Sequence, residues 1–211
     1  MRIDTRDSDW HQFYAGINPD NSSYVLAPRE IFVTPELAFT YSSDGVGGAS
    51  RNFHKWARNH KIAHGDVPRK ILLNSWEGVY FDINESGMDQ MMSDIASMGG
   101  ELFVMDDGWF GDKYQRLSDN SSLGDWVVDR KKLPNGISWL VKQADSHGIR
   151  FGIWIEPEMT NTESELYEKH PDWVLKAPKR DVVTGRGGTQ LVLDLANPEV
   201  RDFIVGMVDD L

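Results

Sequence analysis

Apolar residues along the second two-thirds of the chain alternate between continuous runs and helically spaced stripes. Continuous runs indicate strands buried on both faces, and apolar positions at i, i+3, i+4 and i+7 indicate amphipathic helices between them. The predicted strands are residues 70–74, 102–105 and 149–155, and the predicted helices are residues 85–98 and a segment from about 135 to 147. This order is typical of an α/β protein with a parallel sheet.

The remainder of this part carries weaker signals. Residues 162–169 predict a short helix, residues 179–195 predict a hairpin with residues 185–188 at its tip, and Asn197 with Pro198 starts a helix that continues to the last residue. The loop at 111–133 is longer than most connections, and because long loops are commonly functional we expect it to cover a site.

The first 66 residues differ in pattern from the rest of the chain. Residues 23–26 and 30–34 are rich in β-branched and aromatic side chains, and Asn, Pro and Gly bound them, which predicts strands of a β-sandwich. Glycines at 45, 47 and 48 predict a loop, and apolar spacing at 49–60 predicts a helix. The stretch 65–68, Gly-Asp-Val-Pro, then predicts a break in regular structure, and we place the domain boundary there.

We therefore expect two domains, 1–66 and 67–211. The first is the C-terminal part of a β-sandwich with a linker helix. The second has about three strand-and-helix units with polar or aromatic residues after each strand, which is typical of the N-terminal part of a (β/α)8 barrel. Such a barrel needs about 250 residues, whereas residues 69–211 number 143. The predicted fold is thus α/β, an incomplete (β/α)8 TIM barrel preceded by β-sandwich strands.

Acidic and aromatic residues gather where the predicted strands end. The strand at 102–105 breaks into Asp106, Asp107, Gly108 and Trp109, and the other two strands lead into Trp76 and into Trp154 with Glu156 and Glu158. Because carboxyl ends of strands carry the sites of α/β folds, this pattern favours a ligand site. Carboxylates accept hydrogen bonds from sugar hydroxyls, and an indole covers the C–H face of a pyranose. The alternative is that Asp-Gly makes a turn and Asp106 caps a neighbouring segment.

The residues alone nominate Glu156 and Glu158 as a catalytic acid and base, because retaining glycoside hydrolysis uses two carboxyl groups about 5 to 5.5 Å apart.

Composition narrows the choice of partner. The formal charge of −11 disfavours nucleic acid and anionic membranes, since phosphates would be repelled, and a neutral substrate is easier to accommodate. The absence of cysteine excludes disulfides, thiolate metal sites and cysteine nucleophiles. No apolar run approaches a membrane span, and the N-terminus lacks a signal core. We expect no cofactor, no metal and, by default, a cytoplasmic location.

The motifs, taken in order, resemble those of family 36 glycoside hydrolases, the bacterial α-galactosidases. They are Asn74-Ser-Trp-Glu, Met105-Asp-Asp-Gly-Trp-Phe-Gly, Leu123-Gly-Asp-Trp, Phe151-Gly-Ile-Trp-Ile-Glu-Pro-Glu-Met, His170-Pro-Asp-Trp and Gln190-Leu-Val-Leu-Asp-Leu, with Thr34-Pro-Glu and Arg51-Asn-Phe-His before them. The resemblance implies a β-supersandwich followed by a catalytic barrel. It also implies hydrolysis of terminal α-1,6-linked galactose, as in melibiose and raffinose, with retention through a covalent galactosyl-enzyme.

The resemblance also implies roles for individual residues. Asp106 and Asp107 would hold the galactose O4 and O6 hydroxyls, Trp76 and Trp154 would be aromatic walls, and Arg186 would reach the sugar. In the family the nucleophile is the aspartate of a later Lys-Trp-Asp strand, and the acid/base aspartate comes after it. The resemblance therefore overrules the nomination of Glu156 and Glu158 as the catalytic acid and base. Because Lys-Trp-Asp does not occur here, we expect a segment of the enzyme that is inactive by itself.

Two other functions stay open at this point. One is a non-catalytic carbohydrate-binding protein that uses the half-barrel as its site. The other is a fragment of a galactosyltransferase of the raffinose-synthase type, whose motifs are related. The resemblance further implies that the whole enzyme is a homo-oligomer.

Overall fold

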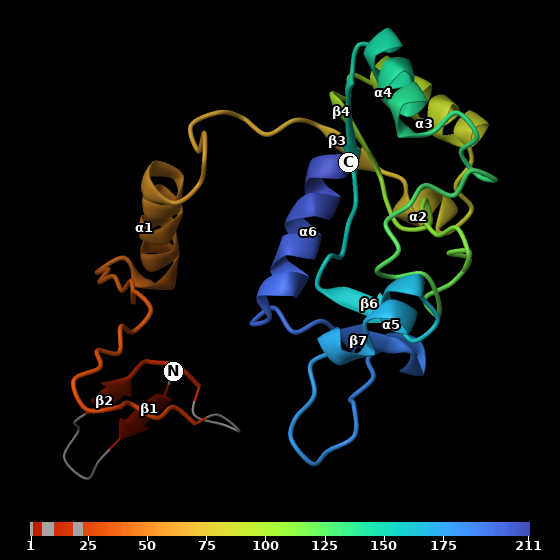
Figure 1. Ribbon diagram of the computed structural model, residues 1–211. Helices are drawn as coiled ribbons and strands as arrows, with labels where there is room; N and C mark the ends of the chain where they lie inside the picture. Colours follow the sequence, from red (N-terminus) through yellow and green to blue (C-terminus); the bar gives the residue numbers. More distant parts are fainter. Residues whose placement is uncertain (1, 6–10, 19–22) are drawn as a thin grey trace. The chain divides into compact units, whose positions relative to one another are not determined.

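The computed structural model describes residues 2–5, 11–18 and 23–211, and it divides into two compact units, Met1–Pro68 and Arg69–Leu211 (Figure 1). Within the described residues, no helix combines the length and the apolar character that crossing a membrane requires.

The first unit contains a two-stranded ribbon and one long helix. Strands β1 (Arg2–Thr5) and β2 (His11–Tyr14) pair antiparallel, with Ile3 opposite Phe13. Residues 23–44, which precede helix α1 (Gly45–His60), contain no helix or strand. The side chains of Phe53 and Trp56 on this helix are each 39% exposed.

Two predicted strands of this unit do not form. Residues 23–26 and 30–34 pair with no strand in the part of the chain that the structure describes. Their side chains are largely exposed, as Val25 (87%), Ile31 (86%) and Val33 (82%) show. β propensity measures how a side chain fits a pleated, half-buried surface, and no neighbouring strand provides that surface here.

The predicted glycine loop is also wrong, because Gly45, Gly47 and Gly48 form the first turn of α1. Gly48 is buried against the side chains of Ser42 and Asp44, so a Cβ at this position would collide with them. The small residues therefore allow the preceding turn to pack closely against the start of the helix.

The second unit is built on a parallel sheet in the order β3-β4-β5. Its strands are β3 (Leu72–Asn74), β4 (Leu102–Met105) and β5 (Arg150–Ile153). Leu73 lies beside Phe103, and Phe103 lies beside Phe151. All three strands were predicted, but β5 ends at Ile153 instead of Ile155, because the chain turns at the Glu-Pro-Glu stretch next to it. Trp154 and Glu156 therefore do not continue the strand.

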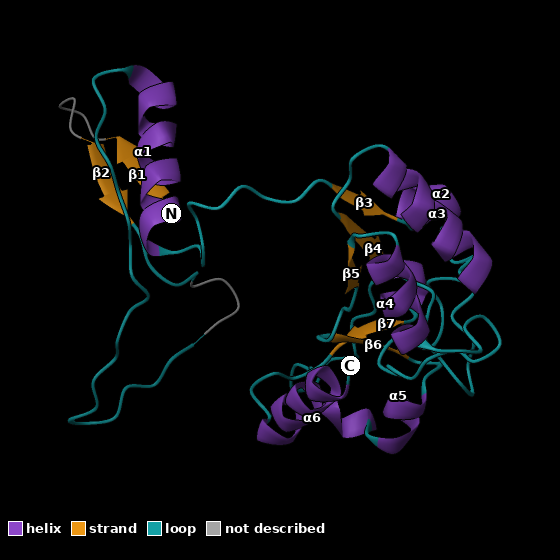
Figure 2. Ribbon diagram, turned by 90° about the horizontal axis from the view of Figure 1, so that it is seen from above, coloured by secondary structure: helices purple, strands orange, loops and turns teal. Residues whose placement is uncertain are grey.

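Two helices cover one face of this sheet, α3 (Glu85–Ser97) and α4 (Ile137–Ser146), as Figure 2 shows. Met88 and Met92 of α3 are fully buried, so this face of the helix serves core packing. They share one core with Phe103 and Met105 of β4 and Leu140 of α4. Each fully buried side chain of this size contributes about 1.5–3 kcal/mol, and the core therefore fixes the strand ends that carry the polar residues. A short helix, α2 (Trp76–Val79), comes directly after β3.

The predicted hairpin at 179–195 is wrong. Strand β7 (Gln190–Val192) pairs antiparallel with β6 (Met159–Asn161), and residues 179–185 contain no strand. The glycine-rich tip is instead a 3-10 turn, η2 (Arg186–Gly188). The pairing with β6 prevails because Asn161, which is fully buried, donates from Nδ2 to Thr189 Oγ1 and thereby anchors the entry to β7.

Three short or terminal elements complete the unit. Helix α5 (Glu165–Lys169) begins at its cap Ser164 and leads into the 3-10 helix η1 (Pro171–Trp173). Helix α6 (Pro198–Asp210) has Asn197 as its cap, with Asn197 Oδ1 accepting from the Glu199 amide, and Pro198 at its first position, as predicted.

Candidate functional site

The carboxyl ends of β3 and β4 bring Asn74 and Asp106 into contact. Asn74 Nδ2 donates to Asp106 Oδ2 at 2.5 Å, and the Asp106 amide donates to the hydroxyl of buried Ser75 at 2.9 Å. Asp106 Oδ1 also accepts from the Asp107 amide at 2.7 Å, and Gly108 adopts φ +109°. Part of the turn-and-cap alternative is thus present. Asp106 remains only partly buried, so lone pairs on its carboxylate are left for a ligand.

Asp107 is held quite differently. It is 3% exposed, and its two oxygens accept from Arg116 Nε at 2.9 Å and Arg116 Nη2 at 2.7 Å. Arg116 is 1% exposed and donates from Nη1 to Ser121 O at 2.8 Å and to Asn161 Oδ1 at 3.0 Å. This bidentate geometry fixes the direction of the Asp107 carboxylate, which has about four acceptor positions and uses two of them on the arginine.

A second cation, Lys132, comes from the same long loop at 111–133 as Arg116. Lys132 Nζ donates to three backbone carbonyls, those of Phe81 at 2.8 Å, Gly108 at 2.7 Å and Arg116 at 2.8 Å. Burial lowers the pKa of Lys132, and the nearby carboxylates of Asp129 and Asp107 act in the opposite direction. Lys132 therefore ties the turn after β4 to the loop that supplies Arg116.

The tryptophans near the strand ends fall into two groups. Trp76 and Trp154 are half-buried. Trp76 packs edge-on against Tyr80 and Phe81, with ring centroids 5.2 and 5.0 Å apart. Trp109 is fully buried and donates from Nε1 to the carbonyl of Trp154 at 3.0 Å, so it is a packing residue.

Glu156 lies on the other side of the site and carries a perturbed carboxyl. Its Oε2 accepts from Gln190 Nε2 at 3.1 Å. Burial raises the pKa of Glu156, the negative charge of Glu158 raises it further, and the positive charge of Arg186 lowers it. Asp107 and Arg116 also act on this carboxyl, which is consistent with one cluster of charges around the ends of β4 and β5.

Arg186 stands at the exposed edge of the cluster. Its side chain is 63% exposed, and Nη1 lies 3.2 Å from Asp119 Oδ1. Asp119 belongs to the long loop at 111–133, which also carries Arg116 and Lys132. This loop thus supplies the partners of two of the predicted site residues, Asp107 and Arg186.

Sequence reasoning missed Arg116, Lys132, Asp119 and Asn161. One signal was available for the first of them. Two adjacent carboxylates at the end of a buried strand need a compensating cation. The loop after that strand offers Lys113 and Arg116 within ten residues of Asp107. Asn161, by contrast, is recognisable only once the pairing of β6 with β7 is known.

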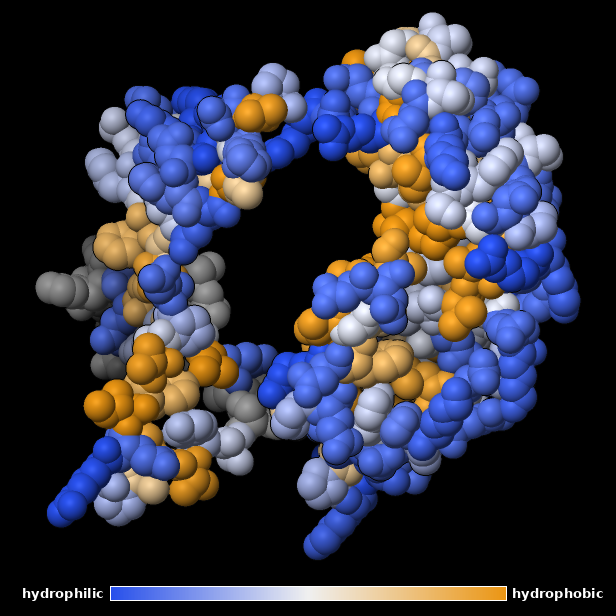
Figure 3. Space-filling model, turned by 45° about the horizontal axis from the view of Figure 1, so that its top comes forward, coloured by the Kyte–Doolittle hydropathy of each residue, from blue (hydrophilic) through white to orange (hydrophobic). Residues whose placement is uncertain are grey.

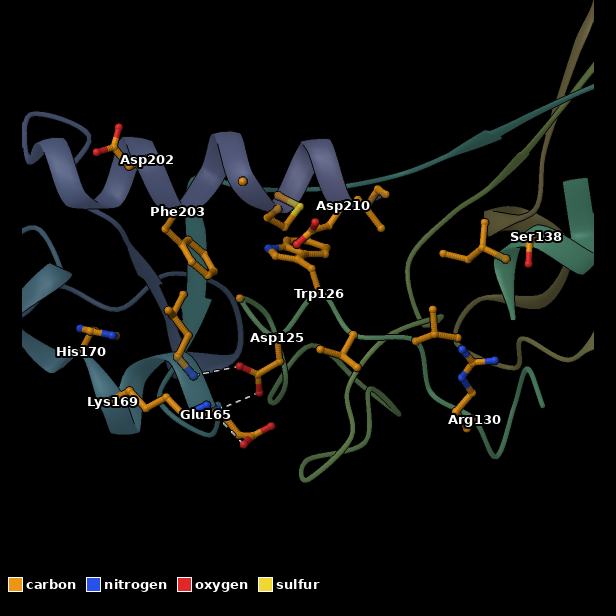
Figure 4. Close-up of a pocket in the computed structure, with 18 of the residues that line it drawn as sticks. Asp125, Trp126, Arg130, Ser138, Glu165, Lys169, His170, Asp202, Phe203 and Asp210 are labelled. Atoms are coloured by element: carbon orange, nitrogen blue, oxygen red, sulfur yellow. Dashed lines mark hydrogen bonds and ion pairs between the residues drawn. The ribbon is translucent and has the colours of Figure 1, made fainter. Parts of the chain in front are cut away.

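The Leu-Gly-Asp-Trp motif has a structural role. Asp125 accepts from the amides of Glu165 and Leu166 at 2.8 and 2.9 Å, which caps helix α5 (Figure 4). Burial raises the pKa of Asp125, and these two hydrogen bonds act to lower it. Trp126 is buried below α6.

A cavity of about 1020 Å³ lies beside this motif, between α4, α5 and α6. Figure 4 shows Phe203 and Asp210 of α6 on one side of it and Arg130 and Ser138 on the other. None of the five predicted sugar-binding residues lines it. Chemistry decides against this cavity as the main site, because the convergent carboxylates and half-buried indoles lie at the strand ends instead.

The described residues thus define a mixed α/β protein with a cluster of carboxylates, arginines and indoles at the carboxyl edge of a parallel sheet. The family model of the melibiases matches residues 31–211, and the chain therefore belongs to the melibiase family.

Its relatives are α-galactosidases. Alpha-galactosidase C of Emericella nidulans is 47% identical over 208 residues, which is 93% of this chain and 27% of the relative. Alpha-galactosidase AgaA of Geobacillus stearothermophilus is 45% identical over 199 residues, 93% of this chain and 26% of the relative. The chain thus spans about a quarter of the length of these relatives.

Solved structures agree with this relationship. The crystal structure of the family 36 α-galactosidase AgaA from G. stearothermophilus matches 99% of this chain and 29% of its own chain, with a TM-score of 0.91 and 42% identity. Variants of AgaA have been solved in complex with stachyose and with raffinose, and each matches 92% of this chain and 27% of its own, at 45% identity and a TM-score of 0.85.

Proposed function

We propose that this chain forms the sugar-binding part of a retaining α-galactosidase that removes terminal α-1,6-linked galactose from oligosaccharides. The observation that carries the proposal is the pair Asp106 and Asp107 at the end of β4, held in different but fixed directions by Asn74 and Arg116. Fixed acceptors lose little conformational entropy when a sugar binds, which favours recognition of hydroxyl groups.

The proposed roles of the site residues rest on their chemistry. Asp106 and Asp107 accept hydrogen bonds from the O4 and O6 hydroxyls of galactose. Trp76 and Trp154 cover C–H faces of the ring, and Arg186 donates to a sugar oxygen from the exposed side. The complexes of AgaA variants with stachyose and raffinose support α-galactosides of this kind as the ligand.

We further propose that the parallel sheet is part of a (β/α)8 barrel. Helices α3 and α4 cover one face of β3, β4 and β5, while the other face holds residues that stay accessible, such as Leu72, which is 48% exposed. Figure 3 shows hydrophobic residues at the surface of the unit Arg69–Leu211, which contains this sheet. Parallel sheets are normally covered on both faces, so further strands and side chains of a barrel would complete this one.

Hydrolysis needs two carboxyl groups placed for retaining chemistry. The family's Lys-Trp-Asp nucleophile motif does not occur in this sequence. Asp106 accepts from Asn74 and Asp107 accepts from Arg116 with both oxygens, and we assign this pair to sugar binding. We therefore expect that this chain binds galactose and does not turn over α-galactosides by itself.

The test combines turnover of an aryl α-galactoside with calorimetric titration of galactose, both on the 211-residue chain. We expect galactose binding without turnover. Turnover that disappears in Glu156→Gln would place the catalytic carboxyls within this chain. It would overturn the proposal that this chain binds the sugar without hydrolysing it. Absence of galactose binding would overturn the proposed sugar site.

A further inference from the structure

We propose that Asp119 is a positioning residue that orients Arg186 toward the sugar and links it to the buried Asp107–Arg116 pair. The inference rests on the proposed function, because Arg186 needs a fixed direction only if it donates to a ligand. It assigns a role to an acidic residue outside the conspicuous sequence motifs.

Asp119 stands between the two arginines of the site. Its Oδ1 lies 3.2 Å from Arg186 Nη1 and 3.7 Å from Arg116 Nη2. The charges from Asp107 through Arg116 and Asp119 to Arg186 therefore alternate in sign. One carboxylate thus connects a fully buried ion pair with an exposed arginine.

The hydrogen bonds of Arg116 explain why Asp119 is available to Arg186. A guanidinium has five N–H donors. Four of them are used by Asp107, Ser121 and Asn161, which leaves the second N–H of Nη2 facing Asp119 at a distance too long for a hydrogen bond. Arg116 therefore attracts the Asp119 carboxylate without forming a hydrogen bond to it. The carboxylate stays available to Arg186, which makes the shorter contact.

The backbone of Asp119 is held by the side chain of Asn161. Its carbonyl accepts from Asn161 Nδ2 at 3.0 Å, and the same Asn161 amide group donates to Thr189 Oγ1 at 3.1 Å. Asn161 itself is fully buried, so the side chain that makes both bonds is held in the interior. The segment that carries Asp119 and the segment just after Arg186 consequently share one rigid anchor.

The two segments also touch directly. The Asn120 side chain fills the space in which a Cβ on Gly187 would stand, and Gly187 adopts φ +64°. Any other residue at 187 would be strained and would push the Arg186 turn away from Asp119. The contact between Asn120 and Gly187 sets the distance between the two segments. The Asp119 carboxylate then selects the direction of the Arg186 guanidinium.

An arginine that is 63% exposed would otherwise sample many rotamers, because its side chain has several rotatable bonds. Restricting such a side chain before binding removes part of the entropy cost of association. Loss of the restraint should therefore weaken galactose binding by roughly 2- to 10-fold. The fold should persist, since exposed ion pairs contribute little to stability.

The experiment is a double-mutant cycle in galactose binding, measured by calorimetry on the 211-residue chain. Asp119→Asn keeps the shape and removes the charge, and Arg186→Met removes the donor. The matched control is Asp112→Asn, an exposed aspartate of the same loop that forms no ion pair with the described residues. Melting curves would verify that each variant is folded, with midpoints within about 3 °C of the wild type.

We expect Asp119→Asn to weaken binding in the wild-type background and to have no further effect in the Arg186→Met background, because it acts through that arginine. Asp112→Asn should bind as the wild type does. Equal affinities of Asp119→Asn and Asp112→Asn would overturn the inference, and so would a loss that persists without Arg186. A wild-type chain that binds no galactose would instead overturn the proposed function, and the positioning role with it.

Discussion

The two sides of the candidate site hold their charges in opposite ways. On the side of β4, Asp107 and Arg116 are almost entirely buried and joined by two short hydrogen bonds. On the side of β7, Arg186 is largely exposed and pairs with Asp119, whose side chain is 35% exposed. Buried pairs are costly to break, whereas exposed pairs contribute little. The buried side should therefore contribute strongly to folding stability, and the exposed side should contribute little.

This difference indicates a division of roles. Groups whose loss would unfold the protein can hold a ligand acceptor in one direction permanently. Groups whose loss costs little stability can be substituted without unfolding the protein. Substitutions on the two sides should therefore differ in their effect on stability, and the largest effect is expected at the buried cation.

Replacing Arg116 with methionine should be the most damaging change. It leaves Asp107 as a buried carboxylate without its cation, and breaking such a pair typically costs about 3–5 kcal/mol. Urea unfolding followed by circular dichroism should show this loss in the free energy of unfolding. A loss below about 1 kcal/mol would mean that Asp107 is not buried as described, and the contrast between the two sides would disappear.

Lys132→Met should rank next. The substitution leaves the carbonyls of Phe81, Gly108 and Arg116 without their shared donor, and each unsatisfied buried group costs on the order of 1–3 kcal/mol. Because water can reach some of them, we expect a total of about 2–3 kcal/mol in the same unfolding measurement. Lys131→Met, at the exposed neighbouring position, is the control and should change the unfolding free energy by less than about 0.5 kcal/mol.

Glu156→Gln should have a smaller effect that depends on pH. Burial and Glu158 raise the pKa of Glu156 in the folded state, so the folded protein holds this proton more tightly than the unfolded chain does. The resulting stability is present at low pH and is lost as the pH rises through the raised pKa. The variant should therefore match the wild type near pH 4 and exceed it at pH 7 by less than about 1 kcal/mol, allowing for solvent screening.

Thermal melts of both proteins across that pH range would measure the difference. Glu163→Gln, which changes an exposed carboxylate, should show no such trend. A Glu156→Gln variant that is less stable than the wild type at pH 7 would contradict the raised pKa.

Arg186→Met should be the mildest change in stability. Exposed ion pairs contribute about 0–1 kcal/mol, so the unfolding free energy should fall by less than about 1 kcal/mol. The effect on galactose binding should be larger than the effect on folding, because the arginine is proposed to donate to the sugar. If Arg186→Met destabilised the protein as much as Arg116→Met does, the two sides of the site would not differ.

Much of the second unit could be predicted from the sequence. The apolar runs of β3, β4 and β5 and the stripes of α3 and α4 are local patterns, and packing in the structure agrees with them. Residues 23–26 and 30–34 show the limit of this approach. Their side chains favour strands, but a strand needs a partner, and the local sequence does not say whether one is present.

The site was predictable to a similar degree. Asp106, Asp107 and Trp154 are recognisable because they lie at the ends of predicted strands, and the signal is again local. The contacts that hold Arg116 and Arg186 are remote in the chain, since Asn161 lies 45 residues from Arg116 and Asp119 lies 67 residues from Arg186. Such contacts depend on the pairing of β6 with β7, in place of which the sequence predicted a hairpin. The roles of Asn161 and Asp119 were therefore missed together with that pairing, whereas Arg116 and Lys132 lie in the loop that follows β4.

The most direct test of the central claim is calorimetric titration of the chain with galactose and, in parallel, with glucose. The two sugars differ in the orientation of the O4 hydroxyl, the group that the Asp106 and Asp107 carboxylates are proposed to hold. We predict a measurable binding heat with galactose that is absent with glucose and is lost in Asp106→Asn. Equal responses to both sugars, or a galactose response that survives Asp106→Asn, would contradict the assignment of the strand-end carboxylates as the galactose site.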